Sequence, residues 1–201
     1  MRSDTLAKSL SPRQQGTVER LLEAGRDLAE QSTPSQEGIT MRLIAHRAGV
    51  APATAYTYFS TLDALYSHLY MVRLSELSPP VDLGNPVQTI AQAMSDAALL
   101  MADHPQLSAM CRHAILSPDP VAAHLRHEMG AVTERRIAQA MYAADVRGAA
   151  LRNALALALS GAMLQGGLGD RSPADISHQI TTTVRLCLQG NRSETDKDPR
   201  P

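Results

Sequence analysis

The stretch ITMRLIAHRAGVAPATAYTYF, residues 39–59, predicts two short helices joined by a tight turn. Thr40 stands where an N-cap hydroxyl would accept one of the first free backbone N–H groups. Gly49 follows the first predicted helix, at a position that favours a residue with positive φ. Pro52 falls in the first turn of the second helix, where its missing N–H costs nothing. This arrangement is typical of a helix-turn-helix, whose second helix reads DNA.

The composition of the whole chain favours an all-α protein. Its 201 residues are 44% hydrophobic, with one Phe and no Trp, and alternating runs of β-branched residues are absent. The length suits one large domain or two small ones. Cys111 and Cys187 lie in apolar helical patterns and form no spaced set, which favours a reduced, cytoplasmic protein. No signal core opens the chain, and the most apolar run, residues 154–164, is too short to cross a bilayer.

Apolar residues recur with a helical period along the chain and predict about nine helices. Ser78-Pro79-Pro80 ends the fourth of them, because consecutive prolines cannot continue a helix. The predicted organisation is a disordered tail over 1–12, a helix-turn-helix domain with a bridging fourth helix over 13–77, a larger helical domain over 78–190, and a second disordered tail over 191–201.

The helix predicted near residues 154–164 is apolar on almost every side and should be buried on every side. In a chain of this size, one face would meet the domain core and the other would need a partner. The last predicted helix and its copy are the natural partners, which predicts an isologous homodimer with two helices from each subunit. The predicted interface residues are Ala154, Ala158, Ala162, Ile176, Ile180 and Val184.

The order of these parts, and one long motif, point to a known family. The motif T-x-R-x-I-A-x-x-A-G-V-x-x-x-T-x-Y-x-Y-F is carried by Thr40, Arg42, Ile44, Ala45, Ala48, Gly49, Val50, Thr54, Tyr56, Tyr58 and Phe59. It resembles the TetR (tetracycline repressor) family of one-component regulators, specifically over residues 18–70 and elsewhere only in helix order. The resemblance implies an all-α fold with a three-helix helix-turn-helix head and a larger C-terminal domain, residues 78–190, for effector binding and dimerisation.

The resemblance also implies which residues touch DNA. Arg42 would read a base or bind a phosphate, three residues of the second helix would face base edges, and hydroxyl-bearing neighbours would contact the backbone. The implied contacts are Thr40, Arg42, Pro52, Ala53, Thr54, Tyr56, Thr57, Tyr58 and Thr61. Two positions depart from the family pattern: Leu62 replaces a common lysine, and Ala51 replaces a capping Ser or Thr, a loss of roughly 1 kcal/mol at that helix start.

The alternative to DNA binding is that the two short helices only pack within an all-α domain. The distribution of charged residues distinguishes these two interpretations. Residues 13–37 contain five acidic side chains, whereas residues 38–62 contain none and carry Arg42, His46 and Arg47. A surface that faces phosphates excludes carboxylates, because affinity comes largely from counterions released at phosphates. The absence of acids therefore favours DNA binding, although the net charge of −1 by itself favours neither reading.

Other candidate sites are weaker. His124, His127 and Glu128 share one helix, but no third protein ligand beside the imidazoles is apparent and a solvated face is expected. No nucleophile set, phosphate loop or cofactor motif appears, so we expect neither an enzyme nor a metal or cofactor.

Methionines on the apolar stripes of the larger domain fill its core or line a pliable pocket for an apolar effector. The candidate pocket residues are Met94, Met101, Met110, His113, Met129 and Met163. The predicted function is a homodimeric repressor that a small molecule releases from a palindromic DNA operator. The alternatives are a regulator of the same fold without an effector, and a helical ligand carrier.

Overall fold

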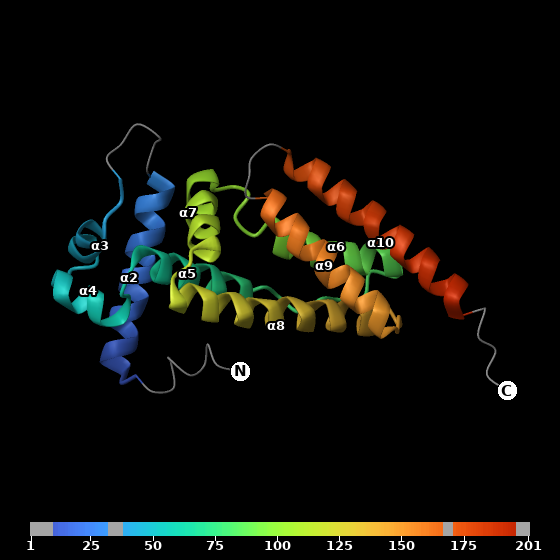
Figure 1. The fold of residues 1–201 in the computed structure, drawn as a ribbon, viewed down its shortest axis with the longest axis horizontal. Helices are drawn as coiled ribbons and strands as arrows, with labels where there is room; N and C mark the ends of the chain where they lie inside the picture. The colour runs from blue at the N-terminus through green and yellow to red at the C-terminus, as the bar shows by residue number, and fades with distance from the viewer. Residues whose placement is uncertain (1–9, 32–37, 167–170, 196–201) are drawn as a thin grey trace. The chain divides into compact units, whose positions relative to one another are not determined.

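A computed structural model describes residues 10–31, 38–166 and 171–195, and within these ranges the chain forms nine helices and no strand (Figure 1). The all-α prediction is confirmed. The helices are α2 (Pro12–Gln31), α3 (Met41–Arg47), α4 (Pro52–Tyr58), α5 (Leu62–Ser75), α6 (Pro86–Ala98), α7 (Pro105–Leu116), α8 (Pro120–Ala143), α9 (Ala149–Gly166) and α10 (Pro173–Thr195). None of these helices combines the length and the apolarity needed to cross a bilayer.

The chain divides into two compact units. Unit 1 comprises Met1–Ser75 and Asp103–Met129, and unit 2 comprises Glu76–Ala102 and Gly130–Pro201. The first division falls close to the boundary predicted after residue 77. Residues 103–129 nevertheless group with the helix-turn-helix, because α7 packs against α5 and α2. Sequence periodicity shows which face of α7 is apolar, but it does not show which helix covers that face.

Unit 1 is organised by a close approach of α2 and α5. A Cβ atom added to Gly25 of α2 would lie 2.8 Å from Cδ2 of Leu65, so any larger residue at this crossing would force the Leu65 side chain to move. The hydroxyl of Tyr66, buried beside it, donates a hydrogen bond of 3.0 Å to the Gly25 carbonyl. Leu21 and Ile44 complete this core with no exposed surface. Helix α3 packs against α2 beside this contact, and α4 packs against α3 (Figure 1).

Side chains cap several helix starts in unit 1. Ser11 and Gln14 cap α2 reciprocally: the amide N–H of each residue is paired with the other's side-chain oxygen. The hydroxyl of Thr61 accepts from the Ala64 amide at the start of α5. Asp119 accepts from the Val121 and Ala122 amides at the start of α8. These caps determine where the helices around the head begin.

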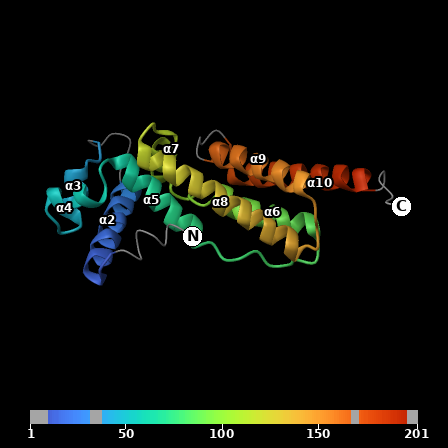
Figure 2. The same cartoon turned by 60° about the horizontal axis from the view of Figure 1, so that its bottom comes forward.

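Unit 2 packs α6, α9 and α10 side by side, with the last two running alongside each other (Figure 2). Its core is aliphatic, and its fully buried large side chains include Ile90, Met94, Ile137, Leu155, Leu159, Ile176 and Val184. Arg136 is the buried charge of this unit, and its guanidinium donates to the Ala93 carbonyl at 2.8 Å, the Ser78 carbonyl at 2.7 Å and the Asp96 carboxylate at 2.7 Å. The Arg136 side chain thereby connects the segment around Ser78, which precedes α6, to α6 itself.

The C-terminal tail differs from its prediction. Residues 191–201 were expected to be disordered, yet α10 continues to Thr195. A single glycine at position 190 costs a helix only about 1 kcal/mol, and no proline follows until residue 199. Residues 1–9 and 196–201 of the predicted tails lie outside the described residues.

Candidate nucleic-acid interface

Local sequence signals place α3 and α4 at the predicted turn. The Thr40 hydroxyl accepts the Leu43 amide at 3.2 Å and caps α3. Gly49 takes φ +67°, and the Val50 amide then bonds back to the Ala45 carbonyl at 3.0 Å. This positive φ is strained for other residues, so the glycine is needed to end α3 sharply. Ala51 supplies no side-chain cap for α4, as its sequence implied.

Four buried side chains pack α3, α4 and the residue after α4 against the core of unit 1. Ile44, Ala45 and Ala55 are fully buried, and Phe59 is nearly so. The Phe59 ring meets the edge of the His68 ring with centroids 5.8 Å apart. Leu43 is 43% exposed and does not belong to the apolar stripe, because the buried positions of α3 are Met41, Ile44 and Ala45.

Most predicted DNA contacts lie on the outer side of α3 and α4. Thr40, Arg42, Pro52, Ala53, Tyr56 and Thr57 are exposed, and Thr54 and Tyr58 are half-buried. Tyr56 exposes 52% of its surface. Thr57 donates its hydroxyl to the Ala53 carbonyl at 3.0 Å, so toward a ligand it offers only a methyl group and a hydrogen-bond acceptor. The surface is therefore narrow, uncharged along α4, and rich in hydroxyl groups.

Thr61 is the exception among the predicted contacts. Its hydroxyl donates to Asp119 Oδ2 at 2.8 Å while also capping α5. The hydrogen bond from Thr61, with support from the Ala122 and Val121 amides, lowers the pKa of Asp119, so this carboxylate stays charged. A hydroxyl that already donates to a charged carboxylate is a poor phosphate contact, so Thr61 does not suit the role predicted for it.

The arginines of α3 differ in their surroundings. Arg47 lies 3.9 Å from Asp27 and 3.5 Å from the Gln31 side-chain oxygen, both on α2. Arg42 has no ion pair or side-chain hydrogen bond within the described part of the chain and is exposed. Arg42 is therefore free to meet a ligand, whereas Arg47 partly serves the packing of α3 on α2.

Sequence reasoning missed one set of residues beside this surface. Arg13, Gln14 and Arg20, on the first half of α2, line a hollow together with Thr54 and Tyr58 of α4. Their signal was present in the sequence: the first half of α2 has two arginines and one acid, Glu19, whereas its second half has Arg26 and three acids. Counting charges over all of residues 13–37 concealed this asymmetry.

Burial suppresses the ionisation of several groups behind α3 and α4. It lowers the pKa of His68, against an opposing effect of the Glu128 charge. It raises the pKa of Cys111 to about 12, so this thiol stays protonated and unreactive at neutral pH. Both groups act as core residues of unit 1. Among the described residues, no group of three potential metal ligands comes together.

The residues predicted for an effector pocket fall in both units. Met94 and Met101 are buried in unit 2, whereas Met129 is buried in unit 1. Met110 and Met163 are half-buried. The His113 side chain is 82% exposed, 4.0 Å from Asp63, so it belongs to the surface and not to a pocket. The apolar pattern predicted that these methionines are at least half-buried, but it could not show whether they line one cavity.

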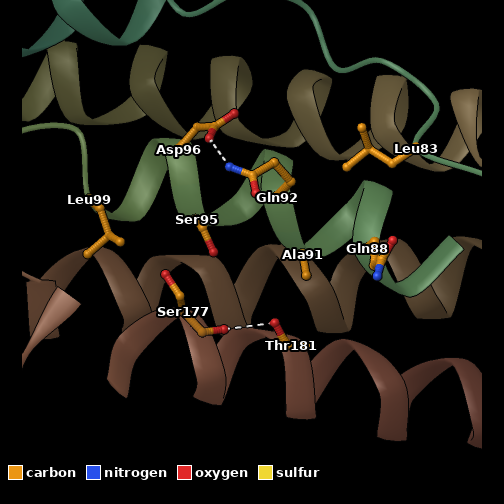
Figure 3. Close-up of a pocket in the computed structure, with 9 residues that line it drawn as sticks. All are labelled: Leu83, Gln88, Ala91, Gln92, Ser95, Asp96, Leu99, Ser177 and Thr181. Atoms are coloured by element: carbon orange, nitrogen blue, oxygen red, sulfur yellow. Dashed lines mark hydrogen bonds between the residues drawn. The ribbon is translucent and has the colours of Figure 1, made fainter. Parts of the chain in front are cut away.

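A groove of about 450 Å³ lies between α6 and α10 of unit 2 (Figure 3). Leu83, Ala91 and Leu99 form its apolar part, and polar side chains of α6 and α10 line the rest. Ser95 of α6 is almost fully buried and directs its hydroxyl toward Ser177 of α10 (Figure 3). Asp96 is held at the rim by Arg136 and by Gln92, whose amide donates to it at 2.7 Å. The volume suits a small molecule with hydrogen-bonding groups.

The residues predicted for the dimer interface fall into two groups. Ile176, Ile180 and Val184 are buried inside unit 2, so their side chains cannot meet a partner, and their assignment is corrected to core. Ala154 is exposed, and Ala158 and Ala162 border a hollow of about 170 Å³ against α10. The large apolar side chains exposed on α9 and α10 are instead Leu157, at 78%, with Leu164 and Leu186.

Comparisons with known proteins agree with this geometry. The chain is 34% identical over 187 residues to an uncharacterised HTH-type transcriptional regulator of Mycobacterium tuberculosis (strain ATCC 25618 / H37Rv), a match that covers 92% of this chain and 86% of that protein. It is equally similar to an uncharacterised HTH-type regulator of Mycobacterium bovis. It is 29% identical over 178 residues to the HTH-type transcriptional repressor KstR of Rhodococcus jostii (strain RHA1), covering 84% of this chain and 81% of that one.

Solved structures show the same fold. A TetR transcriptional regulator from Rhodococcus sp. RHA1 superposes with a TM-score of 0.64 at 20% identity, over 85% of this chain and 96% of that one. A second transcriptional regulator from the same source gives a TM-score of 0.59 at 22% identity, over 86% and 96% of the two chains. No profile of a known protein family matches the chain.

Proposed function

We propose that this chain, which belongs to the TetR family of HTH-type transcriptional regulators, binds a palindromic operator as a homodimer and represses transcription until a small molecule releases it. Binding of the effector would favour a state in which the two heads no longer match successive major grooves, roughly 34–36 Å apart. We expect the protein to be cytoplasmic and to have no catalytic activity.

The surface of α3 and α4 carries this proposal. It has no carboxylate from Gly38 to Leu62, and its exposed polar groups are the guanidinium of Arg42, a row of hydroxyls, and the side chains of His46 and Arg47. Hydroxyls and one cation can position a DNA backbone and read a base edge, for example the two acceptors of guanine. The buried side chains behind them hold the two helices in the orientation that such reading requires.

Selection of random double-stranded DNA on the purified protein, followed by sequencing, tests the proposal. We expect enrichment of an inverted repeat, which is hereafter called the operator, with half-sites spaced by about one helical turn or a multiple of it. Recovery of no enriched sequence by a dimeric protein would instead favour the helical ligand carrier.

Tyr56→Phe should weaken binding to the operator and to unrelated DNA alike. The Tyr56 hydroxyl is exposed and has no hydrogen bond within the described residues, so a phosphate oxygen is a suitable acceptor. Loss of a hydrogen bond to a charged group costs about 1.5 kcal/mol, roughly tenfold in affinity for each contact. Gel-shift titration measures both affinities. Tyr142→Phe, on an exposed tyrosine of unit 2, is the matched control and should change neither.

Leu157→Glu should convert a dimer to monomers. Leu157, Leu164 and Leu186 expose apolar surface on α9 and α10, and an isologous contact would cover that surface twice. A glutamate at position 157 would bury an unpaired charge in such a contact, which opposes association. Sedimentation velocity checks this result, with Leu116→Glu, on an exposed leucine of unit 1, as the control. An unchanged dimer would place the interface elsewhere.

For the effector, we propose the groove between α6 and α10 in place of the methionine set. The buried hydroxyl of Ser95 and the rim amide of Gln92 support a ligand that carries hydrogen-bonding groups rather than the purely apolar effector first expected. A regulator of the same fold without an effector remains the alternative. Thermal-shift screening separates the two, because a ligand that binds the folded state raises its melting temperature.

A further inference from the structure

A hollow of about 340 Å³ lies between the first half of α2 and α4, within unit 1. Arg13, Gln14 and Arg20 enter it from α2, and Thr54 and Tyr58 enter it from α4. Every one of these side chains can donate a hydrogen bond, and no carboxylate lines the hollow. Its lining is therefore suited to an anion that accepts several hydrogen bonds.

The acidic residues of α2 are directed elsewhere. Glu23, Asp27 and Glu30 surround Arg26 at 3.7, 3.2 and 3.9 Å, in the second half of the helix. Arg26 offsets part of their charge there, and neither these carboxylates nor Glu19, the remaining acid of α2, line the hollow. The start of α2 consequently keeps a net positive charge.

The two arginines of the hollow differ in how they are held. Arg20 donates to the Gly16 carbonyl at 3.2 Å and to the Thr17 hydroxyl at 3.4 Å, which leaves three of its five N–H groups for a ligand. Arg13 is exposed, and its guanidinium has no partner among residues 10–31, 38–166 and 171–195. Arg20 is thus partly preorganised, whereas Arg13 is free to close over a ligand.

We propose that this hollow holds one phosphodiester group of the operator, clamped between Arg13 of α2 and Tyr58 of α4. The proposal rests on DNA binding through α4, because that helix supplies both the reading face and one wall of the hollow. The hollow would also supply a phosphate contact from α2, whereas Leu62 at the start of α5 has no group that could make one. A guanidinium binds a phosphate with two parallel hydrogen bonds, which fixes the position of the strand.

Arg13→Gln tests the clamp through the salt dependence of operator binding. Each neutralised phosphate contributes about 0.9 to the slope of log K against log salt concentration. Loss of one clamp in each head of a dimer should therefore make this negative slope shallower by about 1.8. The change should be the same for all DNA sequences. Arg13→Lys should keep most of the slope. Arg26→Gln, the same change on the same helix but outside the hollow, should leave the slope unchanged.

Operators with a single neutral methylphosphonate locate the phosphate. At one position in each half-site, the substitution should weaken binding by the wild-type protein more than binding by Arg13→Gln, which keeps only the contacts from Arg20 and Tyr58. An unchanged salt slope in Arg13→Gln, or the same loss from every methylphosphonate in both proteins, would overturn the clamp while leaving DNA reading through α4 intact. If the wild-type protein selects no operator at all, the proposed function fails and the clamp fails with it. Circular dichroism confirms that the variants remain folded.

Discussion

Replacing Arg136 with methionine should lower the free energy of unfolding of unit 2 by about 3 kcal/mol, the lower end of the cost of breaking a buried ion pair. Arg136 is buried and donates to two backbone carbonyls and to Asp96. Methionine keeps much of the side-chain volume but satisfies none of these acceptors. The cost stays near the lower end because Asp96 reaches solvent and remains hydrated after the change.

Chemical denaturation followed by circular dichroism measures this loss. Arg135→Met is a stringent control, because Arg135 precedes Arg136 on α8 but is exposed, and surface substitutions usually stay within about 0.5 kcal/mol. Asp96→Asn should cost less than Arg136→Met, since an amide oxygen can still accept the 2.7 Å hydrogen bond. Equal effects of the two arginine substitutions would show that the buried hydrogen bonds contribute little to stability.

Arg42→Ala should remove most of the preference of the protein for its operator over unrelated DNA. A guanidinium that bonds two acceptors of one guanine discriminates against other bases by about 1–3 kcal/mol, and a dimer makes the contact twice. Arg42 is exposed on α3 and has no ion pair within the described part of the chain. Arg42→Lys should also lose selectivity, because an ammonium group keeps the charge but not the two-pronged geometry.

Gel-shift titration against the operator and its single-base variants provides the measurement. Arg47→Ala is the matched control on the same helix, since Arg47 already lies against Asp27 and Gln31. It should leave the ranking of DNA sequences unchanged. Uniform weakening of all sequences by Arg42→Ala would contradict base reading and would assign Arg42 to a phosphate.

Local sequence signals predicted the head accurately because each signal acts over a few residues. Thr40 caps α3, Gly49 takes its positive φ, and Pro52 opens α4, as expected from their positions. An apolar residue such as Leu43, next to Ile44 in the sequence, would be placed in the core by its side chain alone, yet Leu43 is 43% exposed. Neighbouring positions on a seven-residue helix differ too little in pattern to resolve such an error.

Features that depend on tertiary contacts were beyond the reach of the sequence. Ile176, Ile180 and Val184 were recognised as an apolar face, yet the pattern could not show that α6 and α9 of the same chain cover it. The role of Thr61 depended on Asp119, which lies 58 residues away. The groove between α6 and α10 brings together residues some 80 positions apart that no local motif connects.

The scarcity of cations on the α3–α4 surface bears on how the protein searches a genome. Binding to arbitrary DNA is almost entirely electrostatic, so a head with few unpaired arginines gains little from sequences other than its operator. Such a regulator spends short times on each non-specific site and slides only briefly before it dissociates. Fewer copies would then be sequestered along the chromosome, and a larger share of the population would stay free to meet the proposed operator.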